Sequence, residues 1–159
     1  MAWAVQTSFI GDAILTLPFL YRALERGENI LLIAAPRNEK IFQLARERGL
    51  KKFAHQLEIV SWNKKTSRNP FKLAALAREW KQHKFFEGKA YCVQRSFSTA
   101  LLATLAGAST RAGFAAGATT FLYTHCARRE WDLGRHEIEK NLDLLRLFEP
   151  VAEIGRAHV

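Results

Sequence analysis

Two kinds of apolar pattern alternate along this chain. Short apolar runs, typical of buried strands, are followed by longer segments in which apolar residues recur every three or four positions. The short runs predict strands over residues 2–6, 30–36, 57–62, 90–94 and 110–114. Regular alternation of strands and helices favours a parallel sheet, because parallel neighbours need a long crossover connection. We therefore expect an α/β fold: a Rossmann-like parallel sheet with helices on both faces.

The predicted helices have stronger signatures than the strands. Residues 17–24 carry apolar side chains at positions i, i+3, i+4 and i+7, and Gly27 follows as the expected C-cap. The same spacing recurs over residues 73–80, and apolar residues over 138–148 form the stripe of a last helix. Residues 96–108 are apolar nearly all round, which predicts a buried helix.

One proline conflicts with the first helix. A helix that begins at Asp12 would place Pro18 beyond its first turn, where proline removes a backbone hydrogen bond and clashes with the preceding turn. The helix is therefore expected either to kink at Pro18 or to restart there, with Thr16 as a second cap.

The composition narrows the class of protein. With 159 residues, of which 48% are hydrophobic and 25% charged, the chain has the length and balance of one soluble domain. Two cysteines without CxxC spacing favour a reducing cytoplasm. The N-terminus lacks the basic region of a signal peptide, and no apolar run approaches the ~20 residues of a membrane span. The net charge of +9 suggests an anionic partner: nucleic acid, a phosphorylated ligand or an acidic membrane face.

The segment VQTSFIGDAILTLP places Asp12 where the first strand gives way to a helix. This is the carboxyl edge of the predicted sheet, where open α/β folds bind their ligands. Gly11 suits a tight turn and a close approach of the backbone to a ligand. Asp12 is either a plain N-cap, which is the more common role, or a carboxylate held ionised and ready to accept a proton from a hydroxyl.

Basic residues gather in two predicted loops at the same edge. Residues 59–78 contain five basic residues and no acid, and Lys64 and Arg68 among them fall in a loop after a strand. Arg95 and Ser96 follow another strand and open a helix, which places a cation and a hydroxyl at a helix N-terminus. These residues predict contacts to phosphate or sugar. The alternatives are a solvated basic loop and a plain Ser96 N-cap.

Several common site motifs are absent from the sequence. Neither G-x-G-x-x-G nor G-x-x-x-x-G-K-[ST] occurs, which counts against a nicotinamide dehydrogenase and a P-loop nucleotidase. In HEIEKN, Lys140 stands where a zinc protease needs a second histidine after His136. We expect no metal site and no thiol nucleophile, and His136 is either a ligand contact or a helix cap. Trp62, Trp80 and Trp131 are expected to pack rather than to stack on bases.

The last seven residues, EIGRAHV, continue no pattern of the helix before them. They match one reading frame of a common sequencing adaptor, GAG ATC GGA AGA GCA CAC GTC. We therefore expect residues 153–159 to be a non-native tail and exclude them from the reasoning on the fold. The natural protein is then expected to continue past about residue 151.

Three segments occur in an order typical of one enzyme family: QTSFIGDAILTLPFL, RSFSTALLATLAGASTRAGF and HEIEKNLDLLRLF. Together they resemble the N-terminal half of the glycosyltransferase family 9 enzymes, the ADP-heptose heptosyltransferases of lipopolysaccharide synthesis. The resemblance implies the GT-B architecture, in which two Rossmann-like domains face each other across a cleft. Residues 1–150 would be the acceptor-binding domain of such a transferase, and the C-terminal nucleotide-sugar domain would be missing.

The resemblance also implies roles for individual residues. The catalytic base of the family is the aspartate of its GD motif, which corresponds to Asp12; it would deprotonate the acceptor hydroxyl in an inverting, metal-independent transfer. Arg95 and Ser96 match the RS motif, and His136 and Asn141 match the HExxxNL helix. The acceptor-binding residues are then expected to be Ser8, Gly11, Lys64, Arg68, Arg95, Ser96 and His136. No cofactor is expected in this half, and ADP-heptose would be the donor.

The partner implied by the resemblance is the phosphorylated inner core of lipopolysaccharide. The protein would be cytoplasmic and peripheral at the inner face of the bacterial inner membrane, and no nucleic acid is expected. Ser98 departs from the family, whose members often carry a second basic residue there. The chain alone is expected to be inactive, because its donor site would be missing. The alternatives are another sugar transferase of the same family, and a non-enzymatic basic module that binds phosphorylated glycolipid or nucleic acid.

Overall fold

Six parallel strands form one sheet in the computed structural model, which describes residues 1–67, 69–127 and 134–149. Strands alternate with helices, as the apolar pattern predicts. In chain order the main elements are β1 (Ala2–Gln6), α1 (Ile10–Glu25), β2 (Ile30–Ala34), α2 (Pro36–Glu47), β3 (Leu57–Ser61), α3 (Pro70–Lys81), β4 (Lys89–Cys92), α4 (Phe97–Leu105), β5 (Thr110–Phe114), β6 (His125–Ala127) and α5 (Glu137–Arg146). Short 3₁₀ helices lie in the connections: η1 (Lys51–Phe53), η2 (Lys64–Ser67), η3 (Lys84–Glu87) and η4 (Gly117–Leu122).

The order of the strands places a topological switch point beside β1. The order is β3-β2-β1-β4-β5-β6, and each neighbouring pair is parallel. Val5 of β1 thus lies between Ile33 of β2 and Cys92 of β4. From β1 the chain builds outward through β2 and β3, then crosses back to place β4 on the other side of β1. Open α/β sheets bind ligands outside the carboxyl ends of the two strands at such a point.

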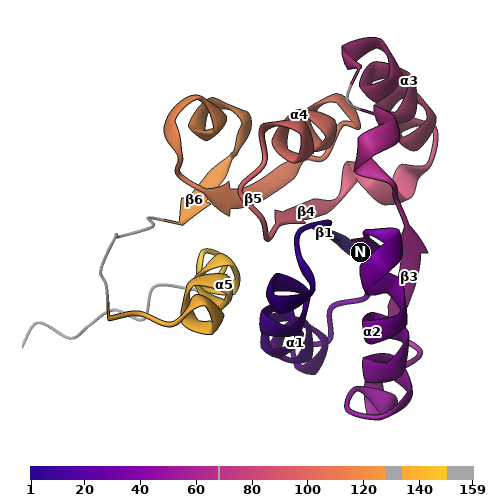
Figure 1. Ribbon diagram of the computed structural model, residues 1–159. Coiled ribbons are helices and arrows are strands. Elements are labelled where there is room, and N and C mark those ends of the chain that lie inside the picture. The colour runs from indigo at the N-terminus through magenta and orange to yellow at the C-terminus, as the bar shows by residue number, and fades with distance from the viewer. Residues whose placement is uncertain (68, 128–133, 150–159) are drawn as a thin grey trace, which may run out of the picture.

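Helices cover both faces of the sheet, which confirms the expected fold class. The helices α1, α2 and α5 lie on one face, and α3 and α4 lie on the other (Figure 1). Side chains alternate across β1: Ala4 packs on the side of α1, whereas Trp3 and Val5 pack on the side of α3 and α4. All residues of β1 are buried, as expected of a central strand covered on both faces.

The first helix begins earlier than the sequence suggests. Phe9 is the N-cap of α1, and the helix continues through Pro18 as a single element, so the restart, one of the two alternatives, does not occur. Thr16 is not a second cap, because its hydroxyl donates to the carbonyl of Asp12 at 2.8 Å from within the helix. Because Phe9 is the N-cap and Asp12 lies inside the first turn, the interpretation of Asp12 as an N-cap is wrong. Gly27 confirms the predicted stop, since it has a φ of 80° directly after the C-cap.

Some element boundaries also differ from the prediction. The strand expected over residues 30–36 ends at Ala34, and Pro36 begins α2 because the fixed φ of proline suits the first helical position. The strand β6 is too short to give a periodic signal. The helix α4 is not buried all round, since Phe97 is 54% exposed.

Candidate functional site

A cavity of about 380 Å³ lies at the switch point, where the ends of β1 and β4 meet the N-terminal turns of α1 and α5. It is lined by Gln6, Ser8, Asp12, Leu15, Val93, Gln94, Arg95, Glu137 and Asn141. The structure thus brings three of the predicted residues, Ser8, Asp12 and Arg95, to one cavity. The remaining wall comes from α5, which is distant in sequence and packs against α1.

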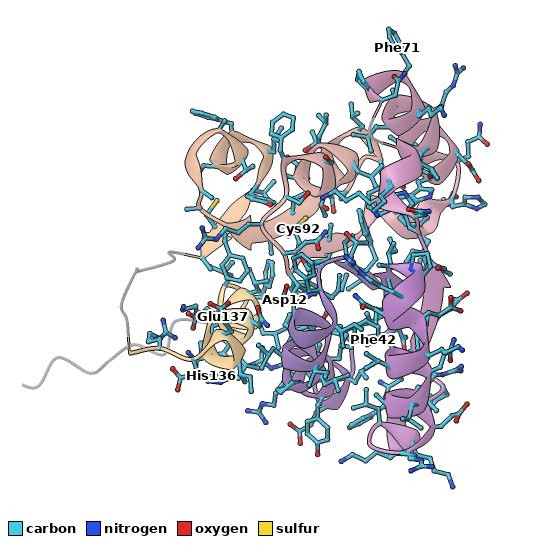
Figure 2. The ribbon with its side chains drawn as sticks, viewed as in Figure 1. Asp12, Phe42, Phe71, Cys92, His136 and Glu137 are labelled. Atoms are coloured by element: carbon cyan, nitrogen blue, oxygen red, sulfur yellow. The ribbon has the colours of Figure 1, made fainter. Side chains whose placement is uncertain are left out.

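The carboxylate of Asp12 is exposed in this cavity. Asp12 is the third residue of α1, and unpaired N–H groups and the helix dipole in that first turn favour a negative charge. Its carboxylate forms no hydrogen bond or ion pair with the part of the chain that the structure describes. Figure 2 shows Asp12 on α1 beside Glu137 on α5. A carboxylate in this setting can accept a proton or a hydrogen bond from a bound hydroxyl.

Gln6, the last residue of β1, anchors the helical turn that carries Asp12. Its Nε2 donates to Oγ1 of Thr16 at 2.8 Å and to the carbonyl oxygen of Asp12 at 3.4 Å. The Thr16 hydroxyl donates to that same carbonyl. The backbone at Asp12 is therefore tied to the end of the strand, while the carboxylate itself is left to the solvent and the cavity.

Ser8 is held at three points in the loop between β1 and α1. Its N–H donates to Oε1 of Gln6 at 3.0 Å, and its carbonyl accepts from Nδ2 of Asn38 at 2.9 Å. Its hydroxyl lies 2.6 Å from Oε1 of Gln94, two residues beyond the end of β4. These bonds tie the loop of β1 to the adjacent strand β4 and to α2.

Three of the residues predicted to bind phosphate or sugar, Lys64, Arg95 and Ser96, lie at or next to the start of α4. Ser96 is the N-cap of this helix, and its hydroxyl accepts from the N–H of Thr99 at 3.4 Å, as the plain capping interpretation expects. The ammonium of Lys64 in η2 also donates to this hydroxyl. Arg95 is exposed and lines the cavity. Two cations and a hydroxyl therefore meet at one edge of the site, whereas Arg68 lies outside the described residues.

His136 does not line the cavity; its neighbour Glu137 does. His136 is the N-cap of α5, and its Nδ1 accepts from the N–H of Ile138 at 3.2 Å, which agrees with the capping alternative. Glu137 accepts from the ammonium of Lys140 at 3.0 Å. Asn141 donates from Nδ2 to the carbonyl of Leu15 at 3.1 Å, so it ties α5 to α1 at the cavity wall.

Three polar residues of the cavity wall were not named as candidates from the sequence: Gln6, Gln94 and Glu137. The two glutamines do leave a signal in the sequence. Each follows a valine at the carboxyl end of an otherwise apolar strand segment, AVQ and YCVQ, where a polar residue is expected to face a ligand edge. Glu137 leaves no comparable signal, because its place beside Asp12 depends on how α5 packs.

Gly11 does not form the expected tight turn. It lies inside α1 and has no positive φ, so its backbone needs no glycine. A Cβ added there would meet no atom within 4 Å. Any requirement for glycine at this position would therefore come from a bound ligand rather than from the fold.

The remaining candidate chemistry lies away from the cavity. Within the described residues, no group of three or more His, Cys, Asp or Glu residues is placed to hold a metal ion. Cys92 is fully buried in β4, and burial raises the pKa of its thiol to about 12, so the thiol stays protonated at neutral pH.

Trp62 and Trp80 pack edge to face in the core beside α3, as expected, and Trp131 lies outside the described residues. No helix among the described residues is both long and apolar enough to cross a bilayer.

Comparison with known proteins finds similarity in structure alone. No family model matches the sequence, and no curated protein matches it. The chain resembles a glycosyl transferase of family 9 from Veillonella parvula at 18% identity and a TM-score of 0.64, over 91% of this chain and 40% of that chain. It also resembles the E. coli heptosyltransferase WaaC in two structures, one with ADP and one with ADP-2-deoxy-2-fluoro heptose.

The similarity to WaaC is close to that to the Veillonella parvula protein in identity, TM-score and coverage of this chain. Both structures are 18% identical to this chain, with TM-scores of 0.62 and 0.63, and the match covers 90% of this chain. It covers 45% and 46% of the two WaaC chains, so this chain spans less than half the length of the proteins it matches. The chain therefore has the Rossmann-like α/β fold found in part of these glycosyltransferases.

Proposed function

We propose that this chain is the acceptor-binding half of a family 9 glycosyltransferase that transfers heptose from ADP-heptose to the phosphorylated inner core of lipopolysaccharide. The observation that carries the proposal is Asp12, an exposed carboxylate in the cavity at the switch point, without a partner in the described part of the chain. The fold shared with solved glycosyltransferases and the three ordered sequence segments support the same assignment.

In this proposal Asp12 is the general base. Its carboxylate takes the proton of the acceptor hydroxyl while the hydroxyl oxygen bonds to the anomeric carbon of heptose. The bond between that carbon and the phosphate oxygen of ADP breaks, and its electron pair leaves on ADP. Attack opposite to the leaving group inverts the anomeric centre. The family resemblance implies that no metal ion takes part.

The charges around the cavity suggest how the acceptor would lie. Asp12 and Glu137 place carboxylates on the side formed by α1 and α5, whereas Arg95 lines the side next to α4. Lys64 adds a second cation beside Arg95 through its bond to Ser96. Phosphate groups of the acceptor would therefore bind on the Arg95 side, and neutral sugar hydroxyls would face Asp12.

The donor would bind to a second domain. The solved relatives are more than twice as long as the part that this chain matches, and one of them carries an ADP-heptose analogue. A cleft between this domain and the second one would bring the donor to Asp12. Because the acceptor is anchored in lipid, the complete protein would work in the cytoplasm against the inner face of the inner membrane, and the net charge of +9 suits that anionic surface.

The test is the substitution Asp12→Asn in the complete protein, assayed by ADP release and by mass spectrometry of the glycosylated acceptor. We expect kcat to fall by about 10²–10⁴-fold, because a general base is removed, while acceptor binding stays nearly intact. Glu39→Gln is a matched control, since Glu39 lies in the first turn of the neighbouring helix α2 and does not line the cavity. A kcat of Asp12→Asn close to that of the wild type would remove Asp12 from the mechanism.

A second measurement distinguishes the non-enzymatic alternative. A basic binding module should bind nucleic acid with an affinity that falls steeply with salt, and lipopolysaccharide oligosaccharides should not compete. Binding of that kind, together with no heptose transfer by the complete protein, would overturn the proposed function.

A further inference from the structure

We infer that Gln94 is a positioning residue that turns the Ser8 oxygen into a pure hydrogen-bond acceptor, so that the site selects a hydroxyl donor of the ligand at that point. The inference rests on the proposed function for the identity of the ligand, the acceptor sugar. It adds a second contact beside the reacting hydroxyl at Asp12.

The partners of Gln94 determine the orientation of its amide. The backbone N–H of Thr7 donates to Oε1 at 3.0 Å, and a backbone N–H can only donate. Oε1 is therefore the atom that faces it. The amide nitrogen Nε2 then faces two hydroxyl oxygens, Oγ1 of Thr7 at 2.6 Å and Oγ1 of Thr99 at 3.0 Å, and donates to both.

The direction of the Ser8 hydroxyl follows from this orientation. Its oxygen lies 2.6 Å from the same Oε1 of Gln94, which can only accept. The single proton of Ser8 must therefore point at Gln94, and the rest of the oxygen carries only lone pairs. Ser8 lines the cavity and is half-buried. A ligand group that reaches Ser8 in the cavity must consequently bring its own proton.

Gln94 itself has no capacity left for a ligand. Its oxygen accepts from Thr7 and Ser8, and both protons of its nitrogen go to Thr7 and Thr99. The residue is 7% exposed, although it contributes to the cavity wall. Its influence on a ligand therefore passes through Ser8, which is also fixed by Gln6 and Asn38.

The chemistry of the ligand follows from the pair of acceptors. Asp12 and Ser8 line one cavity and both accept hydrogen bonds, so two hydroxyls of one sugar can be satisfied there, one that reacts and one that is only recognised. A phosphate oxygen facing Ser8 would set lone pair against lone pair. The phosphate is thereby turned toward Arg95, whose guanidinium is a donor. The geometry thus fits a polyol that carries a phosphate on its other side.

The test is a double-mutant cycle on the 159-residue chain, with phosphorylated inner-core oligosaccharide released from lipopolysaccharide as the probe and calorimetric titration as the measurement. We expect Ser8→Ala and Gln94→Met each to raise Kd about fivefold, the loss of roughly one hydrogen bond. The double variant should bind no worse than Ser8→Ala alone, because Gln94 acts through Ser8. The control Gln82→Met changes an exposed glutamine at the end of α3 and should leave Kd unchanged.

Each other outcome is decisive. Additive losses in the double variant would show that Gln94 acts independently of Ser8 and would overturn the inference, as would an unchanged Kd in Gln94→Met. A wild-type chain that does not bind the oligosaccharide would overturn the proposed function and the inference with it. If near-ultraviolet circular dichroism shows that Gln94→Met is unfolded, Thr99→Val takes its place in the cycle. It removes one partner of Nε2, and we expect about a twofold rise in Kd that disappears in the Ser8→Ala background.

Discussion

The ammonium of Lys64 donates a hydrogen bond to the hydroxyl of Ser96, across 32 residues of sequence. The sequence suggested each residue separately, one in a basic loop after β3 and one at the start of the helix after β4. Their contact places the cation of η2 at the N-terminus of α4, next to Arg95 and the cavity. A helix N-terminus and a nearby cation both favour bound anions.

Lys64→Gln should therefore weaken binding of the phosphorylated oligosaccharide. We expect Kd to rise roughly fivefold at low salt, since a hydrogen bond from a charged group to phosphate is lost. Titration of the dephosphorylated oligosaccharide should show almost no change. Lys51→Gln makes the same charge change on an exposed residue in η1, outside the cavity, and serves as the control. Equal losses for both oligosaccharides would argue against a phosphate contact.

The 159-residue chain should not transfer heptose when it is isolated. The proposal assigns the donor site to a second domain, so ADP-heptose would have no partner surface opposite Asp12. Sequencing the source DNA beyond residue 151 should identify that domain, and a protein containing both domains should release ADP in the presence of acceptor. Robust transfer by the chain alone would contradict the division of substrates between two domains.

Two glycine substitutions should change the stability in opposite directions. A Cβ on Gly113 would come within 2.3 Å of the Tyr123 ring, so Gly113→Ala should destabilise the fold by about 1–3 kcal/mol. Gly11 lies in helical backbone with open space around its Cβ, so Gly11→Ala should stabilise the chain by about 0.5–1 kcal/mol. Urea unfolding followed by circular dichroism measures both. A destabilised Gly11→Ala would mean that the fold itself requires this glycine.

Stability should fall as the pH rises above 9. Burial raises the pKa of the Cys92 thiol from 9.0 to about 12, despite the opposing hydrogen bond with Tyr123. Below pH 9 neither state is ionised, and the stability is fully present. Between pH 9 and 12 the unfolded thiol loses its proton while the folded one keeps it, which favours unfolding by up to about 1.4 kcal/mol per pH unit.

Two tyrosines extend this effect to higher pH. Burial raises the pKa of Tyr91 and of Tyr123 in the folded state. Their contributions to the stability of the fold are therefore lost as the phenols of the unfolded chain ionise above about pH 10. Urea unfolding at pH 8, 9 and 10 measures the dependence. Cys92→Ala is the comparison, and its free energy of unfolding should fall less steeply between pH 9 and 10. Equal slopes for the two proteins would assign the pH dependence to other groups.

Part of the site was accessible from the sequence because its signals are local. Arg95 and Ser96 follow directly on one predicted strand, Asp12 lies in the segment after another, and the carboxyl ends of parallel strands share one edge. The start of α1 was misplaced, because Phe9 caps it without a side-chain hydrogen bond and so lacks a capping signature. The sequence left two roles for His136, a ligand contact or a helix cap, and only the structure shows that its ring accepts the N–H of Ile138.

The sequence by itself determined the alternation of strands and helices, the parallel sheet, and the polar residues at its carboxyl edge. These follow from hydrophobic periodicity and from residues next to one another in the chain. Only the tertiary structure decided which polar groups meet. The bond from Ser8 to Gln94 spans 86 residues, and Asn141 reaches Leu15 across 126. Such contacts depend on the strand order and on the packing of α5 against α1, which no local pattern encodes.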